Sequence, residues 1–283
     1  MKSVIIQGIK GSFHHEAVTR FFKQEQVEIV DSPTFNSLVR QVVDKKVDLG
    51  MMAIENSIAG SILPNYSLMT KNKLYIGGEI ALPIKHNLLV LKGQKLEDIT
   101  EVRTHPMALL QCENFLDKHE SWQRLAMDDT ATCARNIQEK QMYGVASIGS
   151  KLAAQMYDLE ILAQDIHDVY DNYTRFYLVG TQPMLVKDFN KATLFFYTDH
   201  KQGRLSKVLE ILANHELNLT KIQSVPLSGT VFQYSFHVNV VLTNNNYDLY
   251  YKALEKLKEV TQYLNVLGEY MEDKRPTYKD MNQ

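Results

Sequence analysis

Three short segments at the ends of predicted strands carry the residues best suited to chemistry. Residues 53–61, AIENSIAGS, bring Glu55, Asn56 and Ser57 out of a predicted strand just before a helix expected near Ile62. Free N–H groups at a helix start, together with small hydrogen-bonding side chains, suit an anion such as a carboxylate. An ordinary capped turn would have the same pattern, so both interpretations remain open at this point.

A second segment, THPMALLQC at residues 104–112, joins a short strand to a helix that Thr104 could cap. Gln111 lies in its apolar run, where a buried amide without a partner would cost about 1–3 kcal/mol. Gln111 must therefore be exposed, satisfied locally or directed at a ligand. The segment alone favours the first two.

The third segment, DNYTRF at residues 171–176, begins another predicted strand. Thr174 offers a hydroxyl donor there, and Arg175 offers a bidentate clamp for a carboxylate. A polar strand entry with a surface arginine is the alternative. Residues 128–131, DDTA, and 147–150, SIGS, predict two more capped helix starts, so that loops from two lobes would line one cleft with donors.

Other catalytic signatures are missing from the sequence. It contains no GxxxxGK[ST], HExxH or GxSxG motif, and Gly8 and Gly11 lack the spacing of a dinucleotide fingerprint. The adjacent His14 and His15 would point to different sides of a helix, which favours a solvated helix start over a metal site. These features predict a reaction on a small polyanion that needs no cofactor and no metal.

The charge balance excludes one class of partner. The 283 residues hold 31 Lys+Arg and 33 Asp+Glu, a net charge of -2, which argues against nucleic-acid binding but not against small anions. No apolar run approaches the roughly 20 residues of a membrane span, and the N-terminus lacks a signal sequence, so no membrane partner is expected. Cys112 and Cys133 lack CxxC spacing and are expected to be buried free thiols of a cytoplasmic protein.

The predicted elements that position these segments alternate between strand and helix. Strands 4–6, 27–30 and 49–54, with helices 12–24 and 35–44, predict a parallel sheet that binds ligands beyond the carboxyl ends of its strands. Strands 76–82 and 88–91 follow, the pattern restarts at Val102, and strand 173–179 returns, which indicates two α/β lobes around a hinged cleft. After residue 190, strand 192–197, helix 205–214, strands 218–225 and 231–241, helix 247–257 and strand 263–267 give a βαββαβ order. We expect domains at 1–183 and 190–270 and a polar tail at 271–283.

In this order, ENSIAGS, THPMALLQC, DDTA and above all NYTRF resemble the motifs of prephenate dehydratases that carry a C-terminal ACT domain. The likeness runs from KGSFHHEA near the N-terminus to the βαββαβ segment. It implies an α/β two-lobed catalytic domain of the type 2 periplasmic-binding-protein kind, followed by an α+β ferredoxin-like ACT domain. It also implies a lyase that converts prephenate to phenylpyruvate, with loss of carbon dioxide and water, in L-phenylalanine biosynthesis.

The resemblance gives Thr174 the essential role, as donor to the departing hydroxyl. It implies substrate binding by residues of the three segments, with Thr104 where serine is common and Met107 where glutamine is common. Those residues are Glu55, Asn56, Ser57, Thr104, Gln111 and Phe176. We expect Arg175 to act as a carboxylate or structural clamp.

The resemblance also implies an effector site for L-phenylalanine in the ACT domain, where binding inhibits. The matching positions are Gly203, Leu205, Asn218, Leu219 and Ser224. Arg204 stands where one effector motif commonly holds the much smaller alanine, and Val225 removes the cation of the arginine that the other motif commonly holds.

Two other functions remain open, an arogenate dehydratase and a catalytically silent amino-acid sensor. A homodimer or homotetramer is expected, because an unpaired sheet edge tends to pair with another chain.

Overall fold

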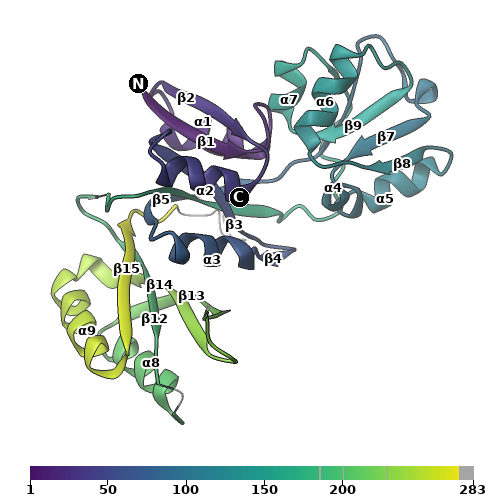
Figure 1. Cartoon of the computed structure of the whole chain (residues 1–283). Helices are drawn as coiled ribbons and strands as arrows, with labels where there is room; N and C mark the ends of the chain where they lie inside the picture. Colours follow the sequence, from purple (N-terminus) through teal and green to yellow (C-terminus); the bar gives the residue numbers. More distant parts are fainter. Residues whose placement is uncertain (185, 200, 228, 274–283) are drawn as a thin grey trace. The chain divides into compact units, whose positions relative to one another are not determined.

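The computed structural model describes residues 1–184, 186–199, 201–227 and 229–273 (Figure 1). Its strands form three sheets in the described part of the chain. Their strand orders are β2-β1-β3-β11-β5 with β4 beside β3, then β10-β6-β9-β7-β8, and finally β13-β14-β12-β15.

The first sheet begins with three parallel strands, β1 (Lys2–Gln7), β2 (Val27–Ser32) and β3 (Leu49–Asn56). Helices α1 (Phe13–Phe22) and α2 (Phe35–Val43) pack against β1 and β3. Each helix begins at a hydroxyl cap, since Ser12 and Thr34 accept from the backbone N–H three residues on. The returning strand predicted at 173–179 is β11 (Tyr173–Gly180), and it lies between β3 and β5 (Tyr75–Pro83).

The second sheet is mixed. Strands β7 (Glu101–Thr104), β8 (Gln123–Ala126) and β9 (Val145–Gly149) are parallel, but β6 (Asn87–Val90) runs antiparallel to both β9 and β10 (Glu160–Ala163). No crossover helix connects β6 to a strand before it in this sheet, so nothing forces it to run parallel. Four α-helices accompany these strands in the described chain: α4 (Pro106–Gln111), α5 (Glu113–Leu116), α6 (Thr130–Glu139) and α7 (Lys151–Met156). Helix α3 (Leu63–Lys71) lies instead between β4 (Gly60–Ser61) and β5 of the first sheet.

The third sheet is antiparallel and has the predicted βαββαβ order. Its elements are β12 (Lys191–Tyr197), α8 (Arg204–Asn214), β13 (Leu217–Pro226), β14 (Tyr234–Leu242), α9 (Tyr247–Val260) and β15 (Tyr263–Tyr270). Helices α8 and α9 pack together over apolar side chains of β12 and β14, including Leu194, Phe196, Val238 and Val240. Strand β14 begins three residues later than expected, because Val231 and Phe232 are exposed at the turn before it.

Polar side chains are also buried around this sheet. Asn239 donates from Nδ2 to the Tyr177 hydroxyl at 2.9 Å, and Thr193 donates to Asn239 Oδ1 at 3.1 Å. Lys191, 1% exposed, pairs with Glu79 of β5 at 2.7 Å. Buried charges require such pairing.

The chain divides into two compact units, one of residues 1–60 and 82–176, the other of residues 61–81 and those from 177 onward. The second unit therefore takes part of the first sheet together with the βαββαβ segment. The domain bounds 1–183 and 190–270 stay predictions from the sequence. Most of the tail expected at 271–283 lies outside the described residues.

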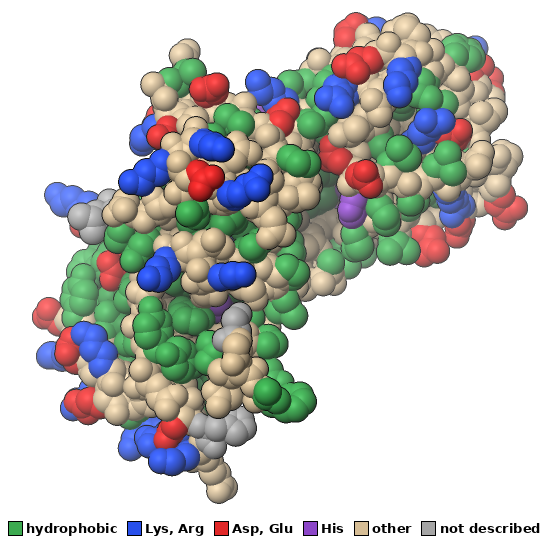
Figure 2. All heavy atoms as spheres, viewed as in Figure 1, with side chains coloured by type: hydrophobic (Ala, Val, Ile, Leu, Met, Phe, Trp, Pro, Cys, Tyr) green, Lys and Arg blue, Asp and Glu red, His purple; other side chains and the backbone are tan. Residues whose placement is uncertain are grey.

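Charged side chains of both signs alternate over the visible face, with no large field of one sign (Figure 2), as the net charge of -2 suggests. None of the described helices combines the length and the apolar character that crossing a bilayer requires.

His237 of β14 should make the fold sensitive to acid. It is 1% exposed between the rings of Tyr66 and Phe195, and neither of its ring nitrogens has a hydrogen-bond partner among the described residues. Burial, and secondarily Lys221, lower the pKa of His237 from 6.5 to about 3. As pH falls from 6.5 towards 3, the unfolded chain takes up a proton that the folded chain cannot, so stability falls by about 1.4 kcal/mol per pH unit.

We therefore expect the variant His237→Phe to have a shallower loss of unfolding free energy between pH 6.5 and 4.5 than the wild type. Urea denaturation at several pH values in this range measures the difference. Equal slopes for the two proteins would contradict a neutral, buried His237.

Candidate active site

Asn56, the last residue of β3, is held in one orientation by the backbone that follows it. Its Oδ1 accepts from the N–H groups of Ile58 and Ala59, at 3.0 and 2.9 Å. Two N–H donors on one oxygen identify that atom as the amide oxygen and fix which way the side chain is turned. The Nδ2 hydrogens of Asn56 therefore point toward β11.

Thr174 of β11 receives one of these hydrogens. Asn56 Nδ2 donates to Thr174 Oγ1 at 3.0 Å, and it also approaches the Tyr173 carbonyl at 3.2 Å. Thr174 is 9% exposed. Because its oxygen already accepts a hydrogen bond, its own O–H proton remains available for donation to a ligand.

A second amide continues this network. Asn56 Nδ2 donates to Asn172 Oδ1 at 2.7 Å, and Asn172 Nδ2 donates to Gln111 Oε1 at 3.0 Å. His86 Nε2 lies 2.9 Å from the same Gln111 oxygen. Side chains at the ends of β3 and β11 thus meet Gln111, at the end of α4, and His86, which directly precedes β6.

Strands β3 and β11 are joined by further contacts beside this network. Ser57 Oγ donates to the Asp171 carbonyl at 2.8 Å and accepts from Tyr173 N at 2.9 Å. Glu55 and Arg175 form an ion pair, with Nε 3.4 Å from Oε2. Arg175 was expected to clamp either a substrate carboxylate or a part of the protein. Its exposure of 8% and its pairing with Glu55 fit the second, structural role.

Two predicted substrate residues lie outside the network. Thr104 is fully buried and donates its hydroxyl proton to the Ile148 carbonyl at 2.9 Å. Phe176 is 1% exposed, and its ring packs edge-on against His14 at 4.9 Å. The structure gives both of them packing partners inside the first unit, and their contact with substrate stays a prediction.

Two local expectations are corrected. His105, not Thr104, caps α4, because its Nδ1 accepts from Met107 N at 3.1 Å. His14 is not solvated: it packs on Phe35 and Phe176, and burial lowers its pKa to about 3. In both cases a histidine ring that could have contacted water contacts a neighbouring backbone or aromatic group instead.

The remaining capped starts are confirmed. Asp129 accepts from Thr132 N at the start of α6, and Ser150 accepts from Ala153 N at the start of α7. Ser150 also donates to the Gly11 carbonyl at 2.9 Å, which fastens the glycine turn before α1. Gly8 and Gly11 have φ of 89° and 93°, a conformation that favours glycine.

The network is electrically neutral. Burial is the main reason why the pKa of His86 is lowered to about 4, so its imidazole is uncharged near neutral pH. Cys112 and Cys133 are buried free thiols as predicted, and burial raises the pKa of Cys133 to about 12. Among the described residues, no group of three or more His, Cys, Asp and Glu side chains could hold a metal ion.

Asn172 and His86 were not among the predicted site residues. Asn172 lies in the DNYTRF segment, next to residues that were chosen, but only its contacts reveal that it joins Asn56 to Gln111. His86 has no motif around it. A histidine directly before an apolar strand was its one signal, and that is ambiguous.

The fold and this group of donors define a two-lobed α/β protein that presents neutral hydrogen-bonding groups, with a ferredoxin-like sheet at its C-terminus. Residues 4–184 match the family model described as prephenate dehydratase. Because this match covers more than half of the chain, the chain belongs to the prephenate dehydratase family.

Similar proteins support this assignment. The chain is 35% identical over 281 residues to arogenate dehydratase/prephenate dehydratase 2, chloroplastic, of Arabidopsis thaliana, covering 95% of this chain and 73% of that one. A crystal structure of prephenate dehydratase from Arthrobacter aurescens in complex with L-Phe is 26% identical, with a TM-score of 0.84, covering 97% of this chain and 92% of that chain. A structure described as GqqA, a quorum-quenching acylase, is 28% identical with a TM-score of 0.84, covering 95% of this chain and 98% of that one.

Proposed function

We propose that this enzyme converts prephenate to phenylpyruvate, with loss of carbon dioxide and water, and that Thr174 assists departure of the hydroxyl group. The observation that carries the proposal is the direction of one hydrogen bond. Asn56 donates to Thr174 Oγ1, which leaves the threonine proton for the substrate.

The reaction requires the protein mainly to position the substrate and to provide hydrogen-bond donors. Breaking the bond to the ring carboxylate while hydroxide leaves makes the ring aromatic, so the substrate supplies its own electron sink. The enzyme has to hold the substrate's conformation and stabilise the charge that develops on the leaving oxygen. Neutral Thr174 has no acidic pKa near neutrality, so hydrogen bonding to the developing hydroxide suits it better than full proton transfer.

Neutral donors also suit the two carboxylates of prephenate. A cation placed tightly against the carboxylate that departs would stabilise it before the reaction and oppose its loss. The Gln111 amide can hold the other carboxylate without that penalty, whereas Arg175 is paired with Glu55. The neutral network thus favours substrate binding that does not oppose decarboxylation.

The same geometry disfavours acylase chemistry at Thr174. A threonine nucleophile needs a base that accepts its proton. Asn56 instead donates to Thr174 Oγ1 and does not activate it. We therefore do not extend the acylase activity of the structural relative to this chain.

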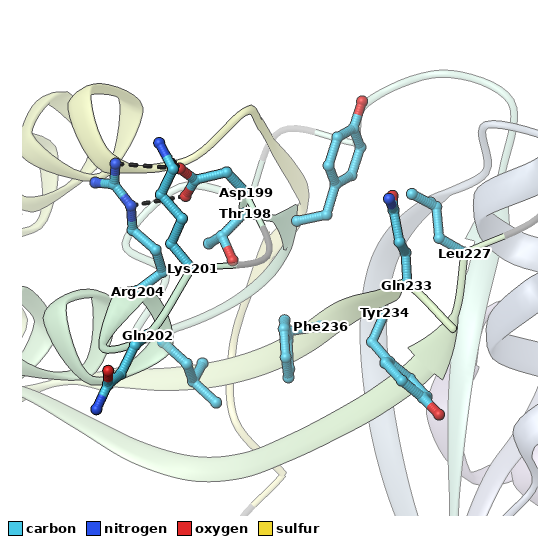
Figure 3. Close-up of a pocket in the computed structure, with 11 residues that line it drawn as sticks. Thr198, Asp199, Lys201, Gln202, Arg204, Leu227, Gln233, Tyr234 and Phe236 are labelled. Carbon is cyan, nitrogen blue, oxygen red and sulfur yellow. Dashed lines mark hydrogen bonds and ion pairs between the residues drawn. The ribbon is translucent and has the colours of Figure 1, made fainter. Parts of the chain in front are cut away.

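Beside the C-terminal sheet, residues that include Asp199, Arg204 and Phe236 line a pocket of about 300 Å³ (Figure 3). Arg204 holds Asp199 through two contacts, Nε to Oδ1 at 2.7 Å and a terminal nitrogen to Oδ2 at 3.2 Å, and Lys201 is 3.2 Å from the same carboxylate. The ring of Phe236, on β14, lies between this ion pair and Leu227 (Figure 3). Charges of both signs beside an aromatic wall suit an amino-acid zwitterion with an aromatic side chain.

We propose that this pocket contributes to an inhibitory site for L-phenylalanine. Leu205 lines the pocket and Gly203 begins the helix beside it. Asn218, Leu219 and Ser224 are not among its lining residues and lie on β13 at the edge of the sheet. Their role in effector binding stays a prediction.

A homo-oligomer in the cytoplasm completes the proposal. Strand β13 is an edge of its sheet and exposes Ile222, so a second copy could pair with it. The two free thiols suit a reducing compartment. Sedimentation velocity at micromolar concentration measures the oligomeric state, and a monomer would overturn that part.

Variants of Thr174 test the catalytic proposal. We expect Thr174→Val, which keeps the shape and removes the hydroxyl, to lower kcat by about 10²–10³-fold, in line with loss of one donor to a developing charge. Thr174→Ser keeps the hydroxyl and should retain most of the activity. The ultraviolet absorbance of phenylpyruvate measures turnover, and circular dichroism checks the fold. Unchanged turnover in Thr174→Val would refute the assigned role.

Competition between substrates separates the two dehydratase activities. We expect a higher kcat/KM for prephenate than for arogenate when both are offered to the wild type. Arogenate carries an additional ammonium, and the network described above offers it no anionic partner. A preference for arogenate would make the chain an arogenate dehydratase, and no turnover of either would favour an amino-acid sensor.

Phenylalanine should inhibit the wild type, and Phe236→Ala should weaken that inhibition at least tenfold, because the aromatic wall of the pocket is lost. Basal turnover should not change. The control Tyr251→Ala removes an exposed aromatic ring of α9 that does not line the pocket, and should leave inhibition intact. Initial rates at increasing phenylalanine, with calorimetric titration, measure both effects. Equal inhibition of Phe236→Ala and wild type would exclude this pocket.

A further inference from the structure

We propose that His86 and Asn172 are positioning residues that turn the Gln111 amide so that its nitrogen, and not its oxygen, faces the substrate. This inference rests on the proposed function. It concerns two residues that were not among the predicted site residues and that act through Gln111 without touching the substrate themselves.

The orientation of Gln111 follows from Asn56, one bond at a time. The N–H groups of Ile58 and Ala59 make Asn56 Oδ1 the acceptor, so Nδ2 must be the atom that faces Asn172. Asn172 Oδ1 accepts from it at 2.7 Å, which leaves Asn172 Nδ2 to donate to Gln111 at 3.0 Å. The atom of Gln111 that receives this bond must be its oxygen.

The same logic assigns the proton on His86. A neutral imidazole carries one proton, and an acceptor at 2.9 Å from Nε2 requires that proton to be on Nε2. His86 is 3% exposed, and its ring forms a T-shaped pair with Phe13 with the ring centroids 5.5 Å apart, so the ring has little freedom to turn. His86 N also donates to His167 Nδ1 at 3.4 Å, which anchors its backbone.

Two donors therefore converge on Gln111 Oε1. Turning the amide over would set its N–H groups against the N–H groups of Asn172 and His86, so the observed orientation is strongly preferred. No hydrogen bond within the described part of the chain occupies Gln111 Nε2, and that atom is not among the buried side-chain atoms that lack a partner. Its hydrogens are thus presented outward, like the proton of Thr174 at the other end of the network.

Paired variants of His86 test the positioning role. His86→Phe keeps an aromatic ring but lacks the donor, and we expect the KM for prephenate to rise about tenfold with a smaller change in kcat. His86→Gln can place an N–H close to the lost Nε2–H and should restore most of the affinity. A KM unchanged in His86→Phe, or a His86→Gln variant as impaired as His86→Phe, would overturn the proposal.

Asn172→Asp tests the second donor. The new carboxylate would face Gln111 Oε1 as an acceptor and draw the amide over, so kcat/KM should fall at least as far as in His86→Phe. Asn87→Asp is the matched control. Asn87 is also fully buried, but its side chain donates to the carbonyls of Lys85 and Gly149 and not to Gln111. Its variant should lose stability and keep the KM of the wild type; an equal rise of KM in both would make the effect merely structural.

The tautomer of His86 can be measured without any substrate. Long-range ¹⁵N–¹H correlation spectra of the wild type at pH 7.5 should show the proton of His86 on Nε2, and a proton on Nδ1 would overturn the inference. If the wild type turns over neither prephenate nor arogenate while this tautomer is found, the proposed function fails and the orientation of Gln111 stands. If the enzyme is active with the other tautomer, the reverse holds.

Discussion

The site depends on one amide whose direction is fixed by the main chain. Two backbone N–H groups just after β3 hold the oxygen of Asn56. This fixes which atom donates and which accepts in the hydrogen bonds from Asn56 to Asn172 and from Asn172 to Gln111. Side-chain amides are symmetrical in shape but not in chemistry, so a network built from them needs one member that cannot turn over. The backbone supplies it here, because the turn that follows the strand cannot be reversed without unfolding the strand end.

Neutrality is the second constraint, and it explains why the overall charge says so little about the ligand. Prephenate carries two carboxylates, yet the groups that converge on the site are amides, hydroxyls and an uncharged imidazole. Such donors bind an anion through hydrogen bonds of defined geometry more than through long-range electrostatic attraction. Arg175, the cation closest in sequence to Thr174, is held by Glu55, so the strand keeps its charge matched locally.

Much of the arrangement could be predicted from the sequence, because strand and helix periodicity, caps and turn residues are local. The order of elements, the C-terminal βαββαβ sheet and the polar residues at the ends of β3 and β11 follow from such patterns. The direction of β6 could not be predicted, because it depends on which strands it pairs with, and β9 comes more than 50 residues later. For the same reason Asn172 and His86 were missed: their importance comes from contacts with Asn56 and Gln111, far away along the chain. The cap of α4 shows the local limit, since His105 and Thr104 are adjacent and either could have reached the helix end.

Strand β11 belongs to both compact units, since the division falls between Phe176 and Tyr177. Thr174, which faces Asn56, is three residues before Tyr177, whose hydroxyl accepts from Asn239 of the C-terminal sheet. An extended strand rises about 3.3 Å per residue, so about 10 Å of one continuous strand separates the two positions. The hydroxyl of Thr174 and the Tyr177–Asn239 hydrogen bond therefore depend on the same strand, so a slip in the register of β11 would displace both at once.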